Sequence, residues 1–330
     1  MNIKSWLKVS VITGLMLLLL TVPLLSACSG NATPVEEKTT TTTTTTTEEV
    51  SEFDVVKDAV ADYLKNKASN IKAADLHMAI AEDNAPYIVS LRSAADYAKG
   101  HIPGAHNIAF GELNTLPKDE EILVYCYTGQ TASFAAAVLG VLGYDVQNLL
   151  HGMSSWSTDP DVYVKRFNAE AHQGDYKTET TANQGSTYDY PELENTTSTS
   201  ESAIIEAAAT SFSPKYIEAS ALNIKIAEGE DMTILSVRSA ADYAAGHIPG
   251  AINFGIDSLV DNLNKLDPDS PVYVYCYTGH TAAQTAALLN MLGYDAYSLK
   301  FGMCSWTSDT AVNAGKCFSA AGVQGYDVEK

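Results

Sequence analysis

The stretch VYCYTGQTAS at residues 124–133 returns almost unchanged as VYCYTGHTAA at residues 274–283. In each copy a β-branched and aromatic run ends at a cysteine, turns through a glycine and enters alanine-rich sequence. This order predicts a strand, a tight turn and a helix, with Cys126 or Cys276 at the carboxyl end of the strand. Open α/β sheets bind their ligands at that edge, so the two cysteines are the first candidates for a functional site.

Two further pairs of matching segments extend the repeat on both sides of the cysteines. LRSAADYAKGHIPGAHN at 91–107 matches VRSAADYAAGHIPGAIN at 237–253, and LGYDVQNLLHGMSSW at 142–156 matches LGYDAYSLKFGMCSW at 292–306. A period of about 150 residues indicates two copies of one domain and not a solenoid of short units. Short apolar runs alternate with helical patterns, so each copy is predicted to be an α/β domain with a mainly parallel sheet flanked by helices. The predicted strands are residues 87–89, 122–125, 146–150, 233–235, 272–275 and 296–299, and the predicted helices are residues 131–142 and 281–292.

The N-terminal residues have the features of a targeting segment. Two lysines precede an apolar stretch at residues 9–25, and small residues lead to Cys28, which is typical of a signal peptide. The sequence LSAC at residues 25–28 resembles the lipobox of bacterial lipoproteins, which implies lipidation of Cys28 and a membrane-anchored protein outside the cytoplasm. An uncleaved anchor, or an ordinary signal with a chance cysteine, is the alternative.

Polar stretches and overall charge set the predicted organisation. Nine consecutive threonines at residues 39–47 have nothing apolar to bury and indicate an extended tether. The formal net charge of −20 repels phosphate backbones, so nucleic acid is not predicted as a partner. The predicted parts are a signal peptide with lipobox at 1–28, a tether at 29–52, a first domain at 53–168, a linker at 169–200 and a second domain at 201–330.

The cysteine turn has the chemistry of an anion site next to a reactive thiol. A turn that enters a helix directs backbone N–H groups and the positive end of the helix dipole inward, which favours the thiolate. Gly129 and Gly279 give the backbone freedom at the turn, and Thr131 and Thr281 are expected to cap the helix or donate to sulfur. The alternative is that both cysteines are small apolar residues buried at strand ends.

The Cys-x-x-Gly-x-Thr turn, together with SLRSAADYAKGHIPGA at 90–105 and GMSSW at 152–156, resembles the rhodanese family of sulfurtransferases. The resemblance implies that Cys126 and Cys276 take sulfur from thiosulfate, polysulfide or a mercapto-acid, carry it as a persulfide and pass it to a thiol or cyanide. It implies no metal and no organic cofactor. The loop residues expected to hold the persulfide are Tyr127, Thr128, Gly129, Gln130, Thr131, Tyr277, Thr278, Gly279, His280 and Thr281.

The loops depart from the family pattern in their charge. Family loops often carry a basic residue that binds an anionic donor, whereas His280 is the only cationic candidate in these two loops. The lack of Lys and Arg there favours an uncharged or polysulfide donor over thiosulfate. Phosphatases with a similar turn need an arginine six residues after the cysteine, where this chain has Ala132 and Ala282. Phosphatase activity is therefore not predicted.

Two arginines are candidates for donor binding from outside the loops. Arg92 and Arg238 match a family arginine implicated in that role, and structural ion pairs with Asp96 and Asp242 are the alternative.

The resemblance also assigns expectations to histidines and tryptophans of each copy. His101 and His247 belong to a segment that is a structural turn in the family, with general-base catalysis as the alternative. Trp156 and Trp306 are expected to be core residues near the site.

Cys304 and Cys317 have no counterparts in the first copy, where Ser154 and Phe167 stand at the matching positions. Because both are absent together, a disulfide confined to the second domain is predicted. A role for Cys304 in resolving a persulfide on Cys276 remains the alternative.

The sequence leaves other functions open. A rhodanese fold could serve as a sulfur-binding or protein-interaction module without turnover. A thiol–disulfide oxidoreductase is disfavoured because the chain contains no Cys-x-x-Cys pair. The presence of the cysteine in both copies favours two working sites over one site and a relic.

Overall fold

The computed structural model describes residues 51–330. The predicted signal peptide, Cys28 and most of the predicted tether lie outside the described residues. No helix within residues 51–330 is both long and apolar enough to cross a membrane.

Two five-stranded sheets form the centre of the fold, and every strand pairing in them is parallel. The first has the order β1-β5-β4-β2-β3 and the second the equivalent order β6-β10-β9-β7-β8. The prediction of two α/β domains with parallel sheets is therefore confirmed. The strands are β1 (Ser69–Ile71), β2 (Tyr87–Ser90), β3 (His106–Asn107), β4 (Ile122–Tyr125), β5 (Val146–Leu149), β6 (Tyr216–Ile217), β7 (Thr233–Ser236), β8 (Ile252–Asn253), β9 (Val272–Tyr275) and β10 (Ala296–Leu299).

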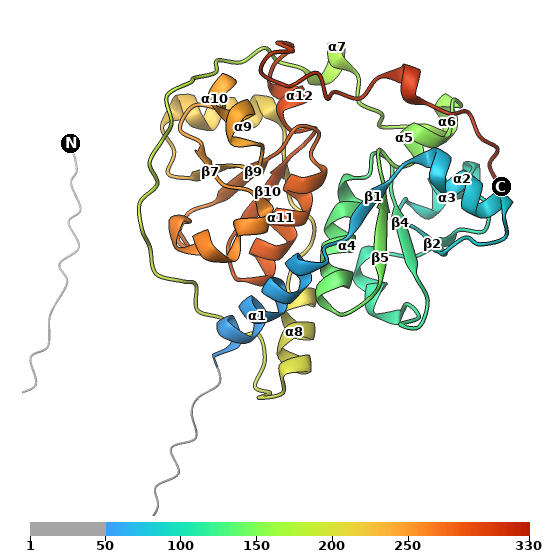
Figure 1. The fold of residues 1–330 in the computed structure, drawn as a ribbon, viewed down its shortest axis with the longest axis horizontal. Helices are drawn as coiled ribbons and strands as arrows, with labels where there is room; N and C mark the ends of the chain where they lie inside the picture. Colours follow the sequence, from blue (N-terminus) through green and yellow to red (C-terminus); the bar gives the residue numbers. More distant parts are fainter. Residues whose placement is uncertain (1–50) are drawn as a thin grey trace, which may run out of the picture. The chain divides into compact units, whose positions relative to one another are not determined.

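Helices cover both faces of each sheet (Figure 1). The first copy contains α1 (Glu52–Lys65), α2 (Ala73–Ala81), α3 (Ala94–Lys99), α4 (Gln130–Val141), α5 (Met153–Trp156), α6 (Pro160–Tyr163) and α7 (Ala169–His172), with the 3₁₀ helix η1 (Phe110–Thr115). The second contains α8 (Glu201–Thr210), α9 (Ala219–Glu228), α10 (Ala240–Ala245), α11 (His280–Met291) and α12 (Met303–Trp306), with the 3₁₀ helices η2 (Ile256–Ser258), η3 (Val260–Lys265) and η4 (Ala320–Gly322).

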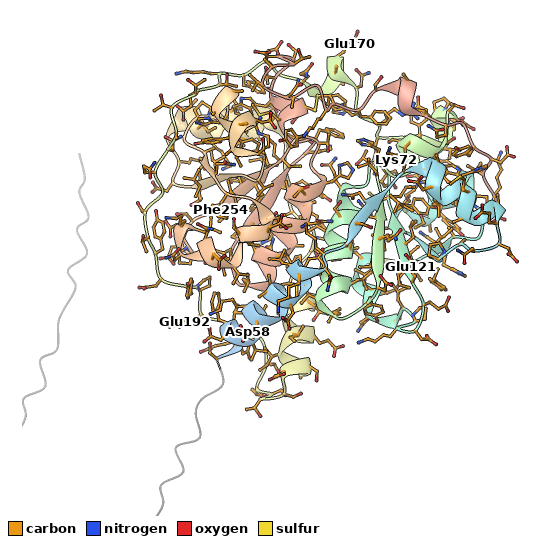
Figure 2. The ribbon with its side chains drawn as sticks, viewed as in Figure 1. Asp58, Lys72, Glu121, Glu170, Glu192 and Phe254 are labelled. Carbon is orange, nitrogen blue, oxygen red and sulfur yellow. A yellow bond between two sulfur atoms is a disulfide. The ribbon has the colours of Figure 1, made fainter. Side chains whose placement is uncertain are left out.

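One of three hydrophobic clusters is shared by the two domains and is built around the contact between α4 and α11, and each domain has another of its own. Both helices are buried on nearly every side, and their alanines allow a close approach between them. A helix that is apolar all round is stable only in such an interior. Side chains fill this region in Figure 2, whereas charged residues such as Glu121 and Glu170 lie at the periphery.

Each domain is crossed by the chain segment that follows the other domain in sequence. Residues 174–181, within the predicted linker, run along the second domain, where Glu179 forms an antiparallel bridge with His247. The C-terminal residues 324–329 run along the first domain, where Glu329 pairs in the same way with His101. Figure 1 shows the C-terminus beside α2 and α3 of the first domain. The predicted linker therefore connects the domains and also forms part of the second one, because its backbone groups pair with that domain.

These crossing segments provide hydrogen-bond partners for the histidines and tryptophans of the repeat. The indole N–H of Trp156 donates to the Asp327 carbonyl at 2.9 Å, and that of Trp306 donates to the Lys177 carbonyl at 3.0 Å. Both tryptophans are buried, as expected for core residues. His101 contacts the carbonyl of Tyr97 and the C-terminal segment, which is a structural role.

Candidate functional site

Cys126 and Cys276 follow the last residues of β4 and β9 and lie in the middle of their sheets. Both are free thiols and are 1% and 3% exposed. We call residues 126–131 the first loop and residues 276–281 the second loop. Gly129 and Gly279 immediately precede α4 and α11 and have φ of 82° and 90°, the left-handed conformation that glycine favours.

One backbone amide of the second loop points towards its sulfur. The N–H of Gly279 donates to Sγ of Cys276 at 3.1 Å. A donor aimed at sulfur at the start of a helix stabilises negative charge there, whether on a thiolate or on a persulfide. This is the arrangement that the cysteine turn was expected to form.

A glycine turn supports each loop from behind. The N–H of Met153 donates to the Cys126 carbonyl at 2.9 Å, and that of Met303 donates to the Cys276 carbonyl at 2.9 Å. A Cβ at Gly152 would lie 2.4 Å from the Cys126 oxygen, and one at Gly302 would lie 2.6 Å from the equivalent oxygen. The Gly-Met pair repeated in the sequence was the signal for this support, although only the nearby tryptophans were interpreted.

The loop tyrosines are held by acidic residues and covered by lysines. The hydroxyl of Tyr127 donates to the Asp96 carboxylate at 2.7 Å, and Tyr277 makes the equivalent bond to Asp242. Hydrogen bonds from Lys99 and then from Tyr127 lower the pKa of Asp96. Nζ of Lys165 lies 4.0 Å from the centre of the Tyr127 ring. Nζ of Lys316 lies 3.6 Å from the centre of the Tyr277 ring in the same way.

The structure corrects the prediction that Arg92 and Arg238 bind the donor. Both are buried, and the guanidinium of Arg92 donates to the carbonyl oxygens of Gly100, Asp96 and Val162 at 2.7, 2.6 and 2.8 Å. Arg238 likewise donates to two backbone carbonyls. The alternative of an ion pair with an aspartate carboxylate is also wrong, because Arg92 uses only the backbone oxygen of Asp96.

The roles expected of the loop threonines change as well. Neither α4 nor α11 has a side-chain hydrogen bond at its N-cap, because that position is occupied by a glycine. The Thr131 hydroxyl lies 2.9 Å from the hydroxyl of Tyr216, which the second domain contributes. Burial, followed by the nearby Cys126, raises the pKa of Tyr216. A residue of the second domain thus completes the surroundings of the first loop.

The side chain of His280 reaches the opposite loop, and that of Gln130 reaches the residue before the glycine that supports the opposite loop. His280 Nε2 lies 3.0 Å from the Thr128 carbonyl, and Gln130 Oε1 accepts from the N–H of Phe301 at 3.0 Å. Burial, and secondly the neighbouring His151, lowers the pKa of His280 to about 3. The one cation expected within the loops is therefore neutral at neutral pH.

A narrow hollow of about 10 Å³, room for about one water molecule, lies between the two loops. Its lining pairs equivalent residues of the repeat, Thr128 with Thr278 and Ser154 with Cys304. Phenylalanine side chains provide much of the remainder, so the hollow has an apolar wall.

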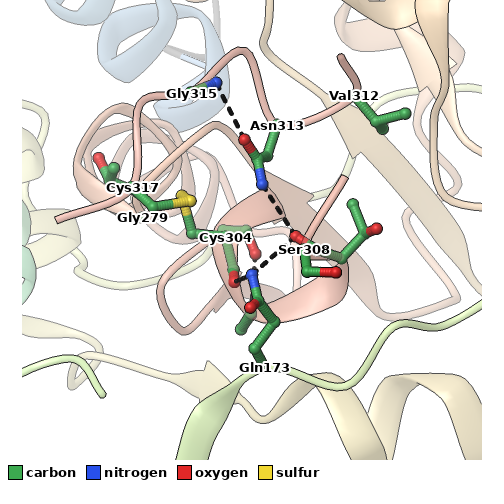
Figure 3. Close-up of a disulfide and its surroundings, with 12 residues drawn as sticks. Gln173, Gly279, Cys304, Ser308, Val312, Asn313, Gly315 and Cys317 are labelled. Atoms are coloured by element: carbon green, nitrogen blue, oxygen red, sulfur yellow. Dashed lines mark hydrogen bonds between the residues drawn. A yellow bond between two sulfur atoms is a disulfide. The ribbon is translucent and has the colours of Figure 1, made fainter. Parts of the chain in front are cut away.

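Cys304 and Cys317 are joined by a disulfide beside the second loop (Figure 3). The N–H of Cys304 donates to the Tyr277 carbonyl at 3.0 Å. Gln173, the C-cap residue of α7 just before the crossing segment, donates to the Cys304 carbonyl at 3.0 Å. The bridge therefore holds the chain near Lys316 against the turn at Gly302 and Met303, which supports the second loop.

Replacing both bridge cysteines with serine is expected to lower the free energy of unfolding by about 3 kcal/mol, because the bridge closes a separation of 13 residues. Urea denaturation of the oxidised protein and of the Cys304→Ser, Cys317→Ser variant measures the difference. Serine is the residue at the matching position 154 of the first domain, so Cys304→Ser is compatible with the local fold. A variant that folds normally but no longer discharges sulfur from Cys276 would indicate the resolving role instead.

Residues 72–159 and 219–309 each match the rhodanese-like domain family, and together the matches span more than half of the chain. The chain belongs to the rhodanese-like family. Each rhodanese-like domain brings its own cysteine loop to the shared interface, and among residues 51–330 these are the only free cysteines.

Several named relatives are similar to one rhodanese-like domain. The thiosulfate sulfurtransferase GlpE of Shewanella oneidensis is 31% identical over 84 residues, covering 25% of this chain and 83% of the relative. That of Pseudomonas entomophila is 35% identical over 80 residues, covering 24% and 73%. The tRNA sulfurtransferase of Pyrobaculum aerophilum is 35% identical over 71 residues, covering 22% of this chain and only 15% of the relative. The solved rhodanese-like domain protein of Staphylococcus aureus is 30% identical, with a TM-score of 0.28, and covers 29% of this chain and 93% of that one.

Proposed function

We propose that this rhodanese-like protein is a sulfurtransferase that carries sulfane sulfur as a persulfide on Cys126 and on Cys276. The observation that carries the proposal is a free cysteine, placed twice at the carboxyl end of a central parallel strand and under a glycine turn. At Cys276 the turn already directs an amide to the sulfur. The names of the GlpE relatives point to the same chemistry.

The proposed reaction has two displacement steps. The cysteine thiolate attacks the outer sulfur of the donor, the donor's S–S bond breaks, and its remainder leaves as sulfite when thiosulfate is the donor. An acceptor such as cyanide or a thiolate then attacks the outer sulfur of the persulfide and releases the cysteine as thiolate. At Cys276 the Gly279 amide, which already points to the sulfur, stabilises the anion at both stages.

The charges around the loops favour an uncharged sulfur chain, or a polysulfide of lower charge than the thiosulfate dianion, as the donor. Arg92 and Arg238 are occupied by backbone carbonyls, and burial keeps His280 neutral at neutral pH. The lysines near the site lie over the tyrosine rings. Thiosulfate and mercapto-acids remain donors to be compared with polysulfide.

The location is proposed from the N-terminal sequence alone. A basic start, an apolar stretch and LSAC at residues 25–28 support export and lipidation of Cys28. The lipid would hold the enzyme at a membrane, outside the cytoplasm.

Brief exposure of the purified protein to polysulfide or thiosulfate is expected to add one sulfur atom to each reactive cysteine. Intact mass spectrometry measures the gain, and cyanide should remove it. Cys126→Ser and Cys276→Ser should each lose one of the two added atoms, and the double variant should lose both.

No mass gain with any donor, on thiols that alkylate readily, would contradict sulfur transfer. Sulfur that is taken up but never discharged to cyanide or a thiol would instead indicate a sulfur-binding module without turnover. A gain confined to one cysteine would show that the other loop is a relic.

A further inference from the structure

We propose that each domain positions the cysteine loop of the other, with His280 acting on the first loop and Gln130 acting on the second. The contacts themselves are independent of the reaction, whereas the effect on sulfur transfer rests on the proposed function. Both side chains are 3% exposed and are the first residues of α11 and α4. They are therefore held in the shared interface by the packing of the two helices.

His280 bridges the two loops through both ring nitrogens. Its Nδ1 lies 2.9 Å from the hydroxyl of Thr278 in its own loop. Its Nε2 lies 3.0 Å from the Thr128 carbonyl and 3.3 Å from the N–H of His151. With the proton on Nε2 the ring donates to Thr128, and with the proton on Nδ1 it accepts from His151. Either tautomer ties the ring to the first domain.

Gln130 makes the reciprocal contact. Its Oε1 accepts from the N–H of Phe301 at 3.0 Å, and its Nε2 donates to the Thr128 hydroxyl at 3.2 Å. The glycine of each turn leaves the room that the opposite side chain occupies. A Cβ at Gly279 would lie 2.3 Å from Gln130 Oε1, and one at Gly129 would lie 2.6 Å from His280 Nε2.

The N–H groups of His151 and Phe301, which donate two of these bonds, lie in strained backbone next to the glycine turns that support the loops. His151 and Phe301 have φ of 62° and 61°, a conformation that is costly for residues with a side chain. Each immediately precedes the glycine turn that supports a loop, Gly152 or Gly302. Because such strain persists only where neighbouring groups hold it, loss of the opposite side chain should relax the support and then the loop.

These contacts predict that replacing His280 or Gln130 affects the cysteine of the opposite domain more than the cysteine of its own loop. His280 touches the backbone of the first domain at two points but its own loop only through the Thr278 hydroxyl. Gln130 touches the backbone of the second domain and its own loop only through the Thr128 hydroxyl. The chain also supplies matched controls, because Gln and His stand at equivalent positions and each performs the same task.

The test measures each cysteine alone, Cys126 in a Cys276→Ser background and Cys276 in a Cys126→Ser background. Polysulfide loading is followed by intact mass, and iodoacetamide alkylation is followed as a function of pH. His280→Ala is expected to slow loading of Cys126 by about tenfold or more, as the loss of one to two hydrogen bonds allows, and that of Cys276 by far less. Gln130→Ala should slow the loading of Cys276 more than that of Cys126. His280→Gln should restore most of the lost Cys126 rate.

Equal slowing of both cysteines, or greater slowing of the cysteine in the same loop, would overturn the proposal. Alkylation needs no sulfur transfer, so the same preference is measurable even if no cysteine takes up sulfur. Failure of the proposed function and failure of this inference are thereby separated. Should His280→Ala not fold, Gln130→Ala decides the question through Cys276.

Discussion

Replacing Arg92 with methionine is expected to lower the free energy of unfolding by at least about 3 kcal/mol, because three buried backbone carbonyls lose a charged donor. Methionine keeps most of the apolar volume of the side chain, so the loss reports on the hydrogen bonds more than on a cavity. These carbonyls belong to Gly100, Asp96 and Val162, so the guanidinium joins α3 and its C-cap to α6. Urea denaturation monitored by tryptophan fluorescence measures the change.

The matched variants are Arg92→Lys and Arg238→Met. Lysine keeps the charge but has no fork of N–H groups to reach three carbonyls, so an intermediate loss is expected. Arg238 donates to the two carbonyls of Val312 and Gly246, so its replacement tests the same role in the second domain. Normal stability together with a raised KM for thiosulfate would return these arginines to donor binding.

The fold followed from the sequence where its patterns were long and repeated. The central strands β4 and β9 are apolar on both faces, and their four-residue runs were predicted with correct ends. The short edge strands β1 and β6 were missed, since SNI and YI carry no run of apolar residues and pair through the backbone. Alanine-rich α4 and α11 were predicted as helices, but their sequences did not show that they would pack against each other.

The site was predictable in its local part only. Cysteine, glycine and threonine within one turn indicated a loop around a thiol, because that chemistry depends on neighbours in sequence. The destinations of Gln130 and His280 were not predictable, since a residue's place in a loop does not tell which domain its side chain will enter. The segment at 174–181 had the polar composition of a linker, and its pairing with the second domain uses backbone groups that composition does not encode.

Acidification is expected to destabilise the protein through His280, which links the interface between the loops to pH. Burial lowers the pKa of His280 from 6.5 to about 3 in the folded protein. The unfolded chain therefore takes up a proton that the folded one refuses, so stability is fully present above about pH 6.5 and is lost as pH falls towards the folded pKa. From pH 6.5 to 4.5 this contribution amounts to about 2 kcal/mol. Burial also lowers the pKa of His151, to about 4, which acts in the same direction.

Comparing the unfolding free energies of wild type and His280→Gln at pH 6.5 and 4.5 tests this linkage. Glutamine keeps a polar side chain at the interface and removes the titration, so the variant should lose about 2 kcal/mol less over this interval. His106→Gln, at an exposed position, serves as the control and should follow the wild type. If wild type and His280→Gln lose equal stability, the ring is not held neutral at the interface. In that case water or an anion would reach the space between the two loops before the domains unfold.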